Sequence, residues 1–192
     1  MALKASQELI SVEDYLAGEL QSEIKHEYLG GVVHAMSGGT VNHGRVGGNC
    51  FGSLFTSLKG QKCQPYNSDV ALRITLPSQI RFYYPDLQIV CDSNDGDEQF
   101  QDKPVVVIEI LSNSTRRIDL GEKRDAYLAI PTLKVLLIID PADHFVRVDR
   151  RHQEGGFQQE RYRDLDEVIP LPEVGTALPL TEIYEGIDLA TG

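Results

Sequence analysis

The sequence predicts a mixed α/β fold in which helices flank a central β-sheet. Two apolar, β-branched runs at 104–111 and 134–139 have the composition of strands that are buried on both faces. A helical pattern over 119–130 separates them and ends at Pro131, and the order strand, helix, strand implies locally parallel pairing. At about 150 residues per domain, the 192 residues form a single domain, 1–192.

The elements before these runs are predicted from capping, turn and periodicity signals. Ser11 begins a capping box for a short helix that extends to about residue 20. Residues 27–36 are typical of a hairpin around two glycines, and 40–58 have apolar residues at helical spacing. Strands are expected over 70–76 and 82–91, which places the N-terminal helix and hairpin before the main sheet.

The segments after the second buried run are predicted to be less regular. Residues 144–149 and 157–163 have the pattern of two strands in a meander. Residues 164–192 are rich in acids and prolines, so we expect an acidic, irregular C-terminal extension packed on the domain, with a final turn near 181–184.

The composition is that of a globular protein with an uneven charge. Hydrophobic residues make up 41% of the chain, and its formal net charge of −11 argues at first against phosphate-rich partners. However, residues 164–192 carry seven acids and no Lys or Arg, whereas 116–163 carry ten bases and eight acids. The bases of 116–163 form either one basic patch or a solvated face of alternating charge.

The absence of certain sequence patterns predicts the compartment of the protein and the state of its cysteines. No apolar run approaches the roughly 18 residues of a membrane span, and the first residues do not have the pattern of a signal peptide. We therefore expect a cytoplasmic protein without a membrane partner. Cys50, Cys63 and Cys91 are odd in number and far apart, so we expect reduced, mostly buried thiols and neither a zinc site nor a disulfide framework.

Several familiar catalytic patterns are absent from the sequence. The glycines at 39 and 44 have the separation of a phosphate-binding loop, but the Lys and Ser/Thr of that loop are replaced by Arg45 and Val46. There is no HExxH pair and no GxSxG turn. Zinc peptidase and serine hydrolase chemistry therefore have no support.

A set of charged residues placed against buried strands remains. Glu109 lies inside an apolar strand, where an unpaired carboxylate costs several kcal/mol and needs a cation or hydrogen bonds. Asp86 follows Pro85 at a strand entry and can lie beside Glu109 if the two strands are neighbours. With the carbonyl oxygen of Ile110, the two carboxylates would offer hard oxygen ligands to Mg²⁺ or Mn²⁺. Lys123, on the next helix, can reach the same end of the sheet and stabilise a phosphate undergoing hydrolysis.

These residues carry a family resemblance that covers nearly the whole chain. The ordered set is similar to the Uma-type putative restriction endonuclease family, long catalogued as a domain of unknown function and placed in the PD-(D/E)XK nuclease superfamily. Its motifs correspond here to Tyr84-Pro85-Asp86, the strand that ends Ile108-Glu109-Ile110-Leu111, the segment 119–127 and the opening segment 27–33. The resemblance implies a restriction-endonuclease-like sheet flanked by helices.

The resemblance also implies roles for individual residues. Asp86 and Glu109 correspond to the metal-binding acids, and Glu27 to an acid near the metal. The chain departs from the superfamily at Leu111, where a lysine is usual, and the lysine is shifted to Lys123.

Three further residues are weaker candidates for the site. Tyr127 lies one helical turn after Lys123 and either supports the site or is a core aromatic. His43 is a candidate substrate contact or an ordinary helix histidine, and Asp69 either flanks the site or is an acid at a strand edge.

The leading hypothesis is a Mg²⁺-dependent endonuclease that hydrolyses DNA phosphodiester bonds and forms a homodimer. A second hypothesis is a non-catalytic interaction or assembly module that keeps the nuclease fold, because the net charge of −11 is unusual for a DNA-binding protein. A third is a hydrolase of a smaller phosphodiester, which would need less basic surface. Metal binding and a comparison of substrates would distinguish the three.

Overall fold

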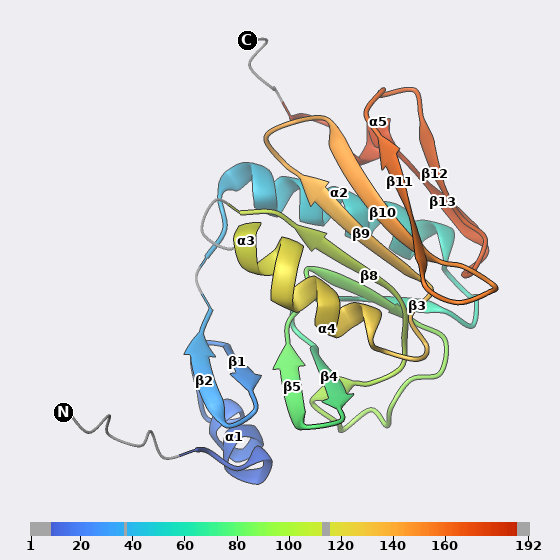
Figure 1. Cartoon of the computed structure of the whole chain (residues 1–192). Coiled ribbons are helices and arrows are strands. Elements are labelled where there is room, and N and C mark those ends of the chain that lie inside the picture. The colour runs from blue at the N-terminus through green and yellow to red at the C-terminus, as the bar shows by residue number, and fades with distance from the viewer. Residues whose placement is uncertain (1–8, 37, 113–115, 188–192) are drawn as a thin grey trace, which may run out of the picture.

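A six-stranded mixed sheet forms the centre of the molecule (Figure 1). The computed structural model describes residues 9–36, 38–112 and 116–187. In the central sheet the strand order is β11-β10-β9-β8-β6-β3, and β8 and β9 are parallel, as predicted, while the other neighbours are antiparallel. The strands are β3 (Gln64–Asn67), β6 (Leu87–Val90), β8 (Pro104–Ile110), β9 (Val135–Asp140), β10 (Phe145–Arg151) and β11 (Phe157–Tyr162).

Helices cover both faces of this sheet, which confirms the predicted fold class. The long helix α2 (Val41–Ser57) packs on one face and buries Val46, Cys50 and Leu54, the residues at helical spacing. Gly47 brings α2 close to β8, because a Cβ atom there would lie 3.3 Å from Ile110 Cδ1. The other face carries a continuous helical segment seen in front of the sheet in Figure 1: α3 (Arg116–Ile118), the π-helical turn η1 (Asp119–Lys123) and α4 (Arg124–Leu128).

A second, five-stranded sheet lies below the helical segment in Figure 1 and contains the predicted N-terminal hairpin. Its order is β2-β1-β5-β4-β7, with β1 (His26–Leu29), β2 (Val32–Ala35), β4 (Ala71–Leu76), β5 (Gln79–Tyr83) and β7 (Phe100–Gln101). Helix α1 (Val12–Glu19) begins as predicted at Ser11, whose side chain accepts a hydrogen bond from the Asp14 amide. Tyr15 of α1 packs on Tyr28 and Phe82, which fixes the helix to this sheet.

The stretch 82–91, expected to be one strand, is divided between the two sheets. Strand β5 ends at Tyr83 in the second sheet, and β6 begins at Leu87 in the central sheet. Pro85 lies between them, and its lack of an N–H group suits a position where the chain leaves one ladder and enters another. The sequence Tyr84-Pro85-Asp86 is therefore the connection between the sheets.

The C-terminal segment is more regular than the sequence indicates. The irregular extension expected over 164–192 instead contains the hairpin β12 (Val168–Leu171) and β13 (Thr176–Pro179), followed by α5 (Leu180–Ile183). Alternate apolar residues of the hairpin, which include Ile169, Leu171 and Leu178, are buried in the core that α2 covers. The short alternating pattern is masked in the sequence by acids and prolines.

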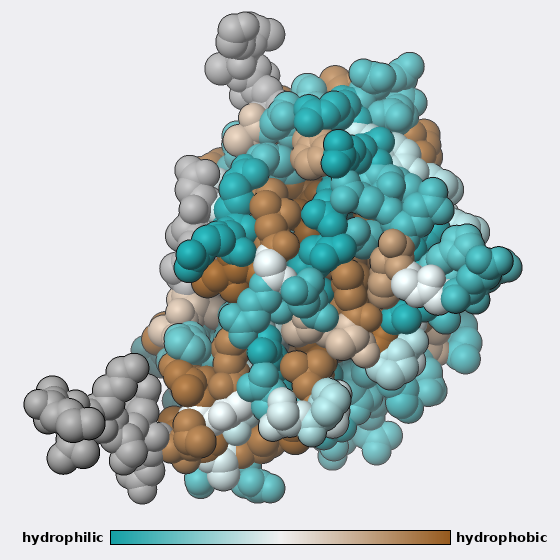
Figure 2. Space-filling model, viewed as in Figure 1, coloured by the Kyte–Doolittle hydropathy of each residue, from teal (hydrophilic) through white to brown (hydrophobic). Residues whose placement is uncertain are grey.

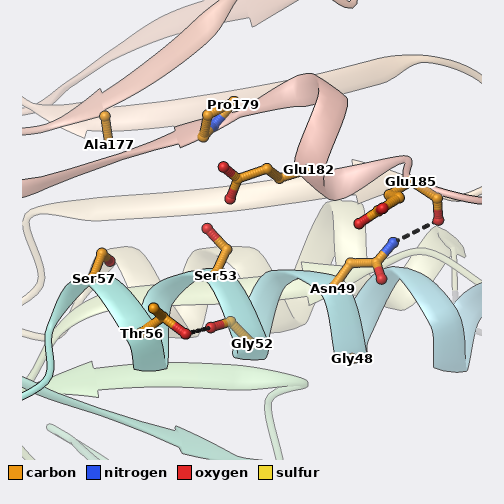
Figure 3. A pocket seen from close by; sticks show the side chains of 10 residues that line it. All are labelled: Gly48, Asn49, Gly52, Ser53, Thr56, Ser57, Ala177, Pro179, Glu182 and Glu185. Carbon is orange, nitrogen blue, oxygen red and sulfur yellow. Dashed lines mark hydrogen bonds between the residues drawn. The ribbon is translucent and has the colours of Figure 1, made fainter.

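An open groove separates α2 from this C-terminal segment (Figure 3). Asn49 of α2 donates hydrogen bonds to the carbonyl oxygens of Ile183 and Glu185, at 3.1 and 2.9 Å, and so fixes the end of α5. Small residues of α2 and two glutamates of the C-terminal segment line the groove. None of the residues that line it belongs to the predicted catalytic set.

The prediction of three reduced cysteines is wrong for two of them. Cys63 and Cys91 form a disulfide, whereas Cys50 is free and buried in the core under α2. The antiparallel register pairs Gln64 with Val90, so the next residues outward, the two cysteines, lie directly opposite each other. No helix in the described ranges is long and apolar enough to cross a membrane.

Asp149 of β10 fastens the helical segment to the central sheet. Its buried carboxylate accepts hydrogen bonds from Arg124 of α4 at 2.9 and 3.0 Å and from Arg147 at 3.1 and 3.0 Å. Burial alone would raise the pKa of Asp149, but these two guanidinium groups hold it below its ordinary value. The carboxylate therefore stabilises the fold in its ionised form.

We expect Asp149→Asn to lower the free energy of unfolding by about 2 kcal/mol at pH 7, because charged hydrogen bonds are lost. A depressed acid pKa contributes stability above the unfolded value of about 3.9, and this contribution is lost as the pH falls through the folded value. The difference between variant and wild type should therefore shrink in urea unfolding as the pH is lowered from 6 to 3. The control is Asp143→Asn, which removes an exposed pair with Arg163 and should cost less than about 1 kcal/mol.

Candidate active site

The predicted residues meet in a cavity of about 350 Å³ between the two sheets and the helical segment. Strand register brings the first two together: β6 and β8 pair Leu87 with Ile108, so Asp86 and Glu109 are the next opposing positions. Six predicted residues line the cavity: Glu27, His43, Asp86, Glu109, Ile110 and Lys123. The sequence predicted that Asp86 lies beside Glu109 only if their strands are neighbours, and β6 and β8 are neighbours.

Asp86 is held by the main chain of the strand beside it. Its Oδ2 atom accepts a 2.7 Å hydrogen bond from the amide of Ile110, and its Oδ1 atom lies 3.5 Å from Nε2 of His43. A strand residue directs its N–H and C=O to the same neighbour, so the Ile110 carbonyl also points to the side of Asp86. Burial raises the pKa of Asp86, and His43 and the Ile110 amide offset part of that rise.

Glu109 is a buried acid of the site whose carboxylate contacts Tyr127 and Lys123. Its Oε1 atom receives the Tyr127 hydroxyl at 2.5 Å and lies 3.0 Å from Nζ of Lys123. The pKa of Glu109 is raised to about 8, mainly because the carboxyl group is buried. The positive charge of Lys123 offsets part of this rise, and the negative charge of Asp86 adds to it. The carboxyl group therefore binds a proton more readily than an exposed glutamate does, and Lys123 is the cation that favours its ionised form.

Lys123 connects the two sheets. Its ammonium group lies 3.0 Å from both Glu109 Oε1 in the central sheet and Glu27 Oε1 in the second sheet, and only 7% of its side chain is exposed. Burial would lower the pKa of Lys123, but the two glutamates raise it above its ordinary value. The residue is therefore a fixed cation and not a base.

A π-helical turn sets the direction of the lysine. Asp119–Lys123 has π-helical hydrogen bonding, which is rare and is often found at functional sites. Lys123 and Tyr127 are four residues apart, so both reach Glu109 from one side of the helical segment. Tyr127 is fully buried and supports Glu109 from behind the cavity, which agrees with both of its predicted roles.

The structure separates Asp69 from the site. Asp69 lies in the turn before β4, its side chain is 70% exposed, and its partner is Lys25. It does not line the cavity, so the prediction that it flanks the site is wrong and the alternative, an acid at a strand edge, holds.

Two residues of the cavity were missed in the sequence. Asp119 is buried and contributes negative charge near both Glu109 and Lys123. Its position four residues before Lys123 on a predicted helix was the available signal. The ring of Tyr83 lies 5.3 Å from the Lys123 ammonium group, which is a cation–π contact. No short sequence motif predicts this contact.

The donor chemistry of the cavity fits a hard divalent cation. Among the described residues, no group of three or more His, Cys, Asp or Glu side chains is arranged to hold a metal ion. The available set is instead two carboxylates, Asp86 and Glu109, with the carbonyl of Ile110. Oxygen ligands of this kind, completed by water, are those that Mg²⁺ takes. Burial is the main cause of the raised pKa values of both acids, so a cation bound between them would favour their ionised forms.

Comparison with known proteins identifies the family of the chain. Residues 12–181 match the model of the Uma2 family, described as a putative restriction endonuclease. Over 179 residues the chain is 30% identical to "Uncharacterized protein slr1290" of Synechocystis sp., with 93% of each protein covered. It is 25% identical over 158 residues to "Uncharacterized protein sll1609" of the same organism, covering 79% of this chain and 88% of the relative.

A solved structure has the same fold. It is the crystal structure of a putative nuclease belonging to DUF820 from Anabaena variabilis, with a TM-score of 0.66 and 18% sequence identity. The match covers 88% of this chain and 97% of that chain.

We expect Lys123→Met to destabilise the protein by about 3 kcal/mol at pH 8 in metal-free buffer, because it leaves two buried carboxylates without their cation. These acids would take up protons in the folded state, and stability falls with rising pH wherever the folded state binds more protons. Urea unfolding should therefore show a smaller loss at pH 5 than at pH 8.

The matched control is Tyr127→Phe, which removes one hydrogen bond to Glu109 and should cost about 1–2 kcal/mol with little dependence on pH. Equal losses for Lys123→Met at pH 5 and pH 8 would contradict the electrostatic role assigned to the lysine.

Proposed function

The chain belongs to the Uma2 family of putative restriction endonucleases, and from that premise we propose that it is a metal-dependent endonuclease that hydrolyses DNA phosphodiester bonds. The main support for the proposal is that Asp86, Glu109 and Lys123 line one cavity. They come from the connection just before β6, from β8 and from the π-helical turn. The word restriction in the family description supports DNA as the substrate.

Asp86, Glu109 and the carbonyl of Ile110 are the residues we assign to a divalent cation, Mg²⁺ or Mn²⁺. Such an ion, when bound, would make a water molecule nucleophilic at neutral pH and neutralise charge on the phosphate. The protein holds the two carboxylates in place through the Ile110 amide and the Tyr127 hydroxyl. His43, 3.5 Å from Asp86, orients that carboxylate from the side of α2.

Lys123 is assigned to electrostatic stabilisation of the phosphate. A permanent ammonium group held by two carboxylates cannot take a proton from water at neutral pH, but it can stabilise negative charge that develops during phosphodiester hydrolysis. Its two ion pairs fix its position before substrate arrives, so the reaction does not have to reorganise it.

Glu27 is better suited to positioning Lys123 than to binding a metal. The contact of its carboxylate in the structure is the lysine ammonium at 3.0 Å, and it comes from the second sheet, across the cavity from β8. We therefore assign to Glu27 the placement of Lys123 over the end of the central sheet.

We expect Asp86→Asn and Glu109→Gln each to lower the rate of Mg²⁺- or Mn²⁺-dependent plasmid cleavage by at least about a hundredfold, because each removes a charged ligand at the reacting phosphate. Supercoiled plasmid is incubated with protein and metal, with EDTA as the blank, and nicked and linear products are measured. Asp69→Asn is the matched control, since it removes an acid of similar sequence context outside the cavity and should cleave like the wild type.

Metal binding is expected to depend on the same residues as cleavage. Isothermal titration of wild-type protein with Mn²⁺ should show saturable binding at millimolar metal or below, and Asp86→Asn should abolish it while Asp69→Asn retains it. Cleavage that persists in both acid variants, or a wild type that neither binds metal nor cleaves DNA, would overturn the proposal and favour a non-catalytic module.

A further inference from the structure

Five arginines lie on one face of the central sheet, beside the helical segment. Arg147 of β10 and Arg161 of β11 project from the face that the helical segment covers in part, and Arg163 follows on the same face over the ring of Phe145. Arg116 of α3 and Arg124 of α4 reach it from the helical segment through Asp140 and Asp149. We call Arg116, Arg124, Arg147, Arg161 and Arg163 the arginine face, and Figure 2 shows hydrophilic side chains over β10 and β11.

The arginine face and the cavity lie on the same side of the sheet and at the same level. Strand register aligns Glu109 with Ile138, Ile138 with Arg147, and Arg147 with Arg161. Residues in one such row point to one face, so these side chains share the face that carries the helical segment. At about 4.8 Å per strand, the row extends roughly 14 Å from the strand of Glu109 to that of Arg161.

The helical segment lies between the cavity and the arginine face. Its consecutive residues Lys123 and Arg124 diverge: Lys123 pairs with Glu109 of β8, and Arg124 pairs with Asp149 of β10. A separation of roughly 14 Å is close to the major-groove width of about 12 Å, which also admits an α-helix. One DNA duplex can therefore reach both sides of the segment.

The charges of the arginine face are incompletely compensated within it. Four carboxylates pair with four of the five arginines: Asp140 with Arg116, Asp143 with Arg163, and Asp149 with both Arg124 and Arg147. The fourth, the exposed Asp125, also lies 3.3 Å from Arg124. Arg161 is exposed, and among the described residues its recorded contact is the side-chain oxygen of Gln159, at 2.8 and 3.2 Å once that amide is oriented toward it. The face thus keeps positive charge on a chain of net charge −11.

The two central arginines also repel each other. Arg147 and Arg161 are direct cross-strand partners, and like charges placed opposite each other destabilise a sheet. The pair between Arg163 and Asp143 is about 60% exposed on both sides, so it contributes little stability and can open. An anion bound between these guanidinium groups would relieve the repulsion without breaking a buried contact.

We propose that the arginine face binds the sugar–phosphate backbone of duplex DNA and positions it for cleavage at the cavity. This inference rests on the proposed nuclease function and adds to it the surface that recognises the substrate. Phosphates are the anions that arginine contacts best, through two parallel hydrogen bonds. Such contacts position the duplex without reading its sequence.

The test is duplex binding measured without cleavage. Fluorescence anisotropy of a labelled 20-base-pair duplex is recorded in EDTA from about 50 to 200 mM salt, for the wild type, Arg161→Gln and Arg161→Glu. Each phosphate contact contributes about 0.9 to the slope of log affinity against log salt. We expect Arg161→Gln to reduce the slope by about one and weaken binding about three- to tenfold, with a larger loss for Arg161→Glu.

The matched control is Lys103→Gln, which removes one exposed positive charge outside the arginine face and so changes the net charge equally. It should bind like the wild type. Because Arg161 is exposed and its replacement removes the repulsion with Arg147, the urea midpoint of Arg161→Gln should not fall below that of the wild type. Equal slopes for Arg161→Gln, Lys103→Gln and wild type, or no duplex binding by wild type, would overturn the inference.

A second readout separates this inference from the nuclease proposal. Cleavage of bis(p-nitrophenyl) phosphate with Mn²⁺ needs the cavity but not the arginine face, so Arg161→Gln should retain it. Lost plasmid cleavage with retained small-substrate cleavage supports the arginine face. If Arg161→Gln weakens duplex binding but wild type cleaves neither substrate, the nuclease proposal fails and the binding surface stands.

Discussion

The buried ion pair between Glu109 and Lys123 is the constraint on which the arrangement of the molecule depends. A carboxylate in the interior of a central strand is tolerated only with a cation and hydrogen bonds beside it. The cation comes from the helical segment that connects β8 to β9, so that segment must cross the face of the sheet at this level. Glu27 pairs with the same lysine from the second sheet, which fixes the two sheets around the cavity.

The helical segment therefore makes ion pairs on two sides. Lys123 completes the cavity on one side, and Arg124 fastens the segment to β10 through Asp149 on the other. Consecutive side chains of a helix point in different directions, and residues four apart share a face, so Lys123 and Arg124 diverge while Tyr127 still supports Glu109. Lys123 therefore both compensates charge in the core and places a cation in the cavity.

The sequence revealed the centre of the site because the signals there are local. Strand composition predicted that Asp86 and Glu109 would meet if their strands were neighbours, the family resemblance singled out both acids, and helical spacing put Lys123 and Tyr127 on one face. What it did not reveal depends on partners distant in the chain. Examples are the disulfide between Cys63 and Cys91, set by the register of β3 and β6, and the hairpin of the C-terminal segment, stabilised by the core under α2. Asp69 shows the converse: an acid near a strand end need not face the site if a turn directs it to solvent.

The ion pairs of Lys123 also determine at which stage of folding the cavity can form. Glu27 comes early in the chain, Asp86 and Glu109 near its middle, and Lys123 after both, so the pocket has no local precursor. Contacts between residues so distant in sequence form late, because closing long loops costs entropy before the contacts compensate it. A growing or partly folded chain thus lacks the cavity even where its strands have formed, and the cavity is complete only when the fold is complete.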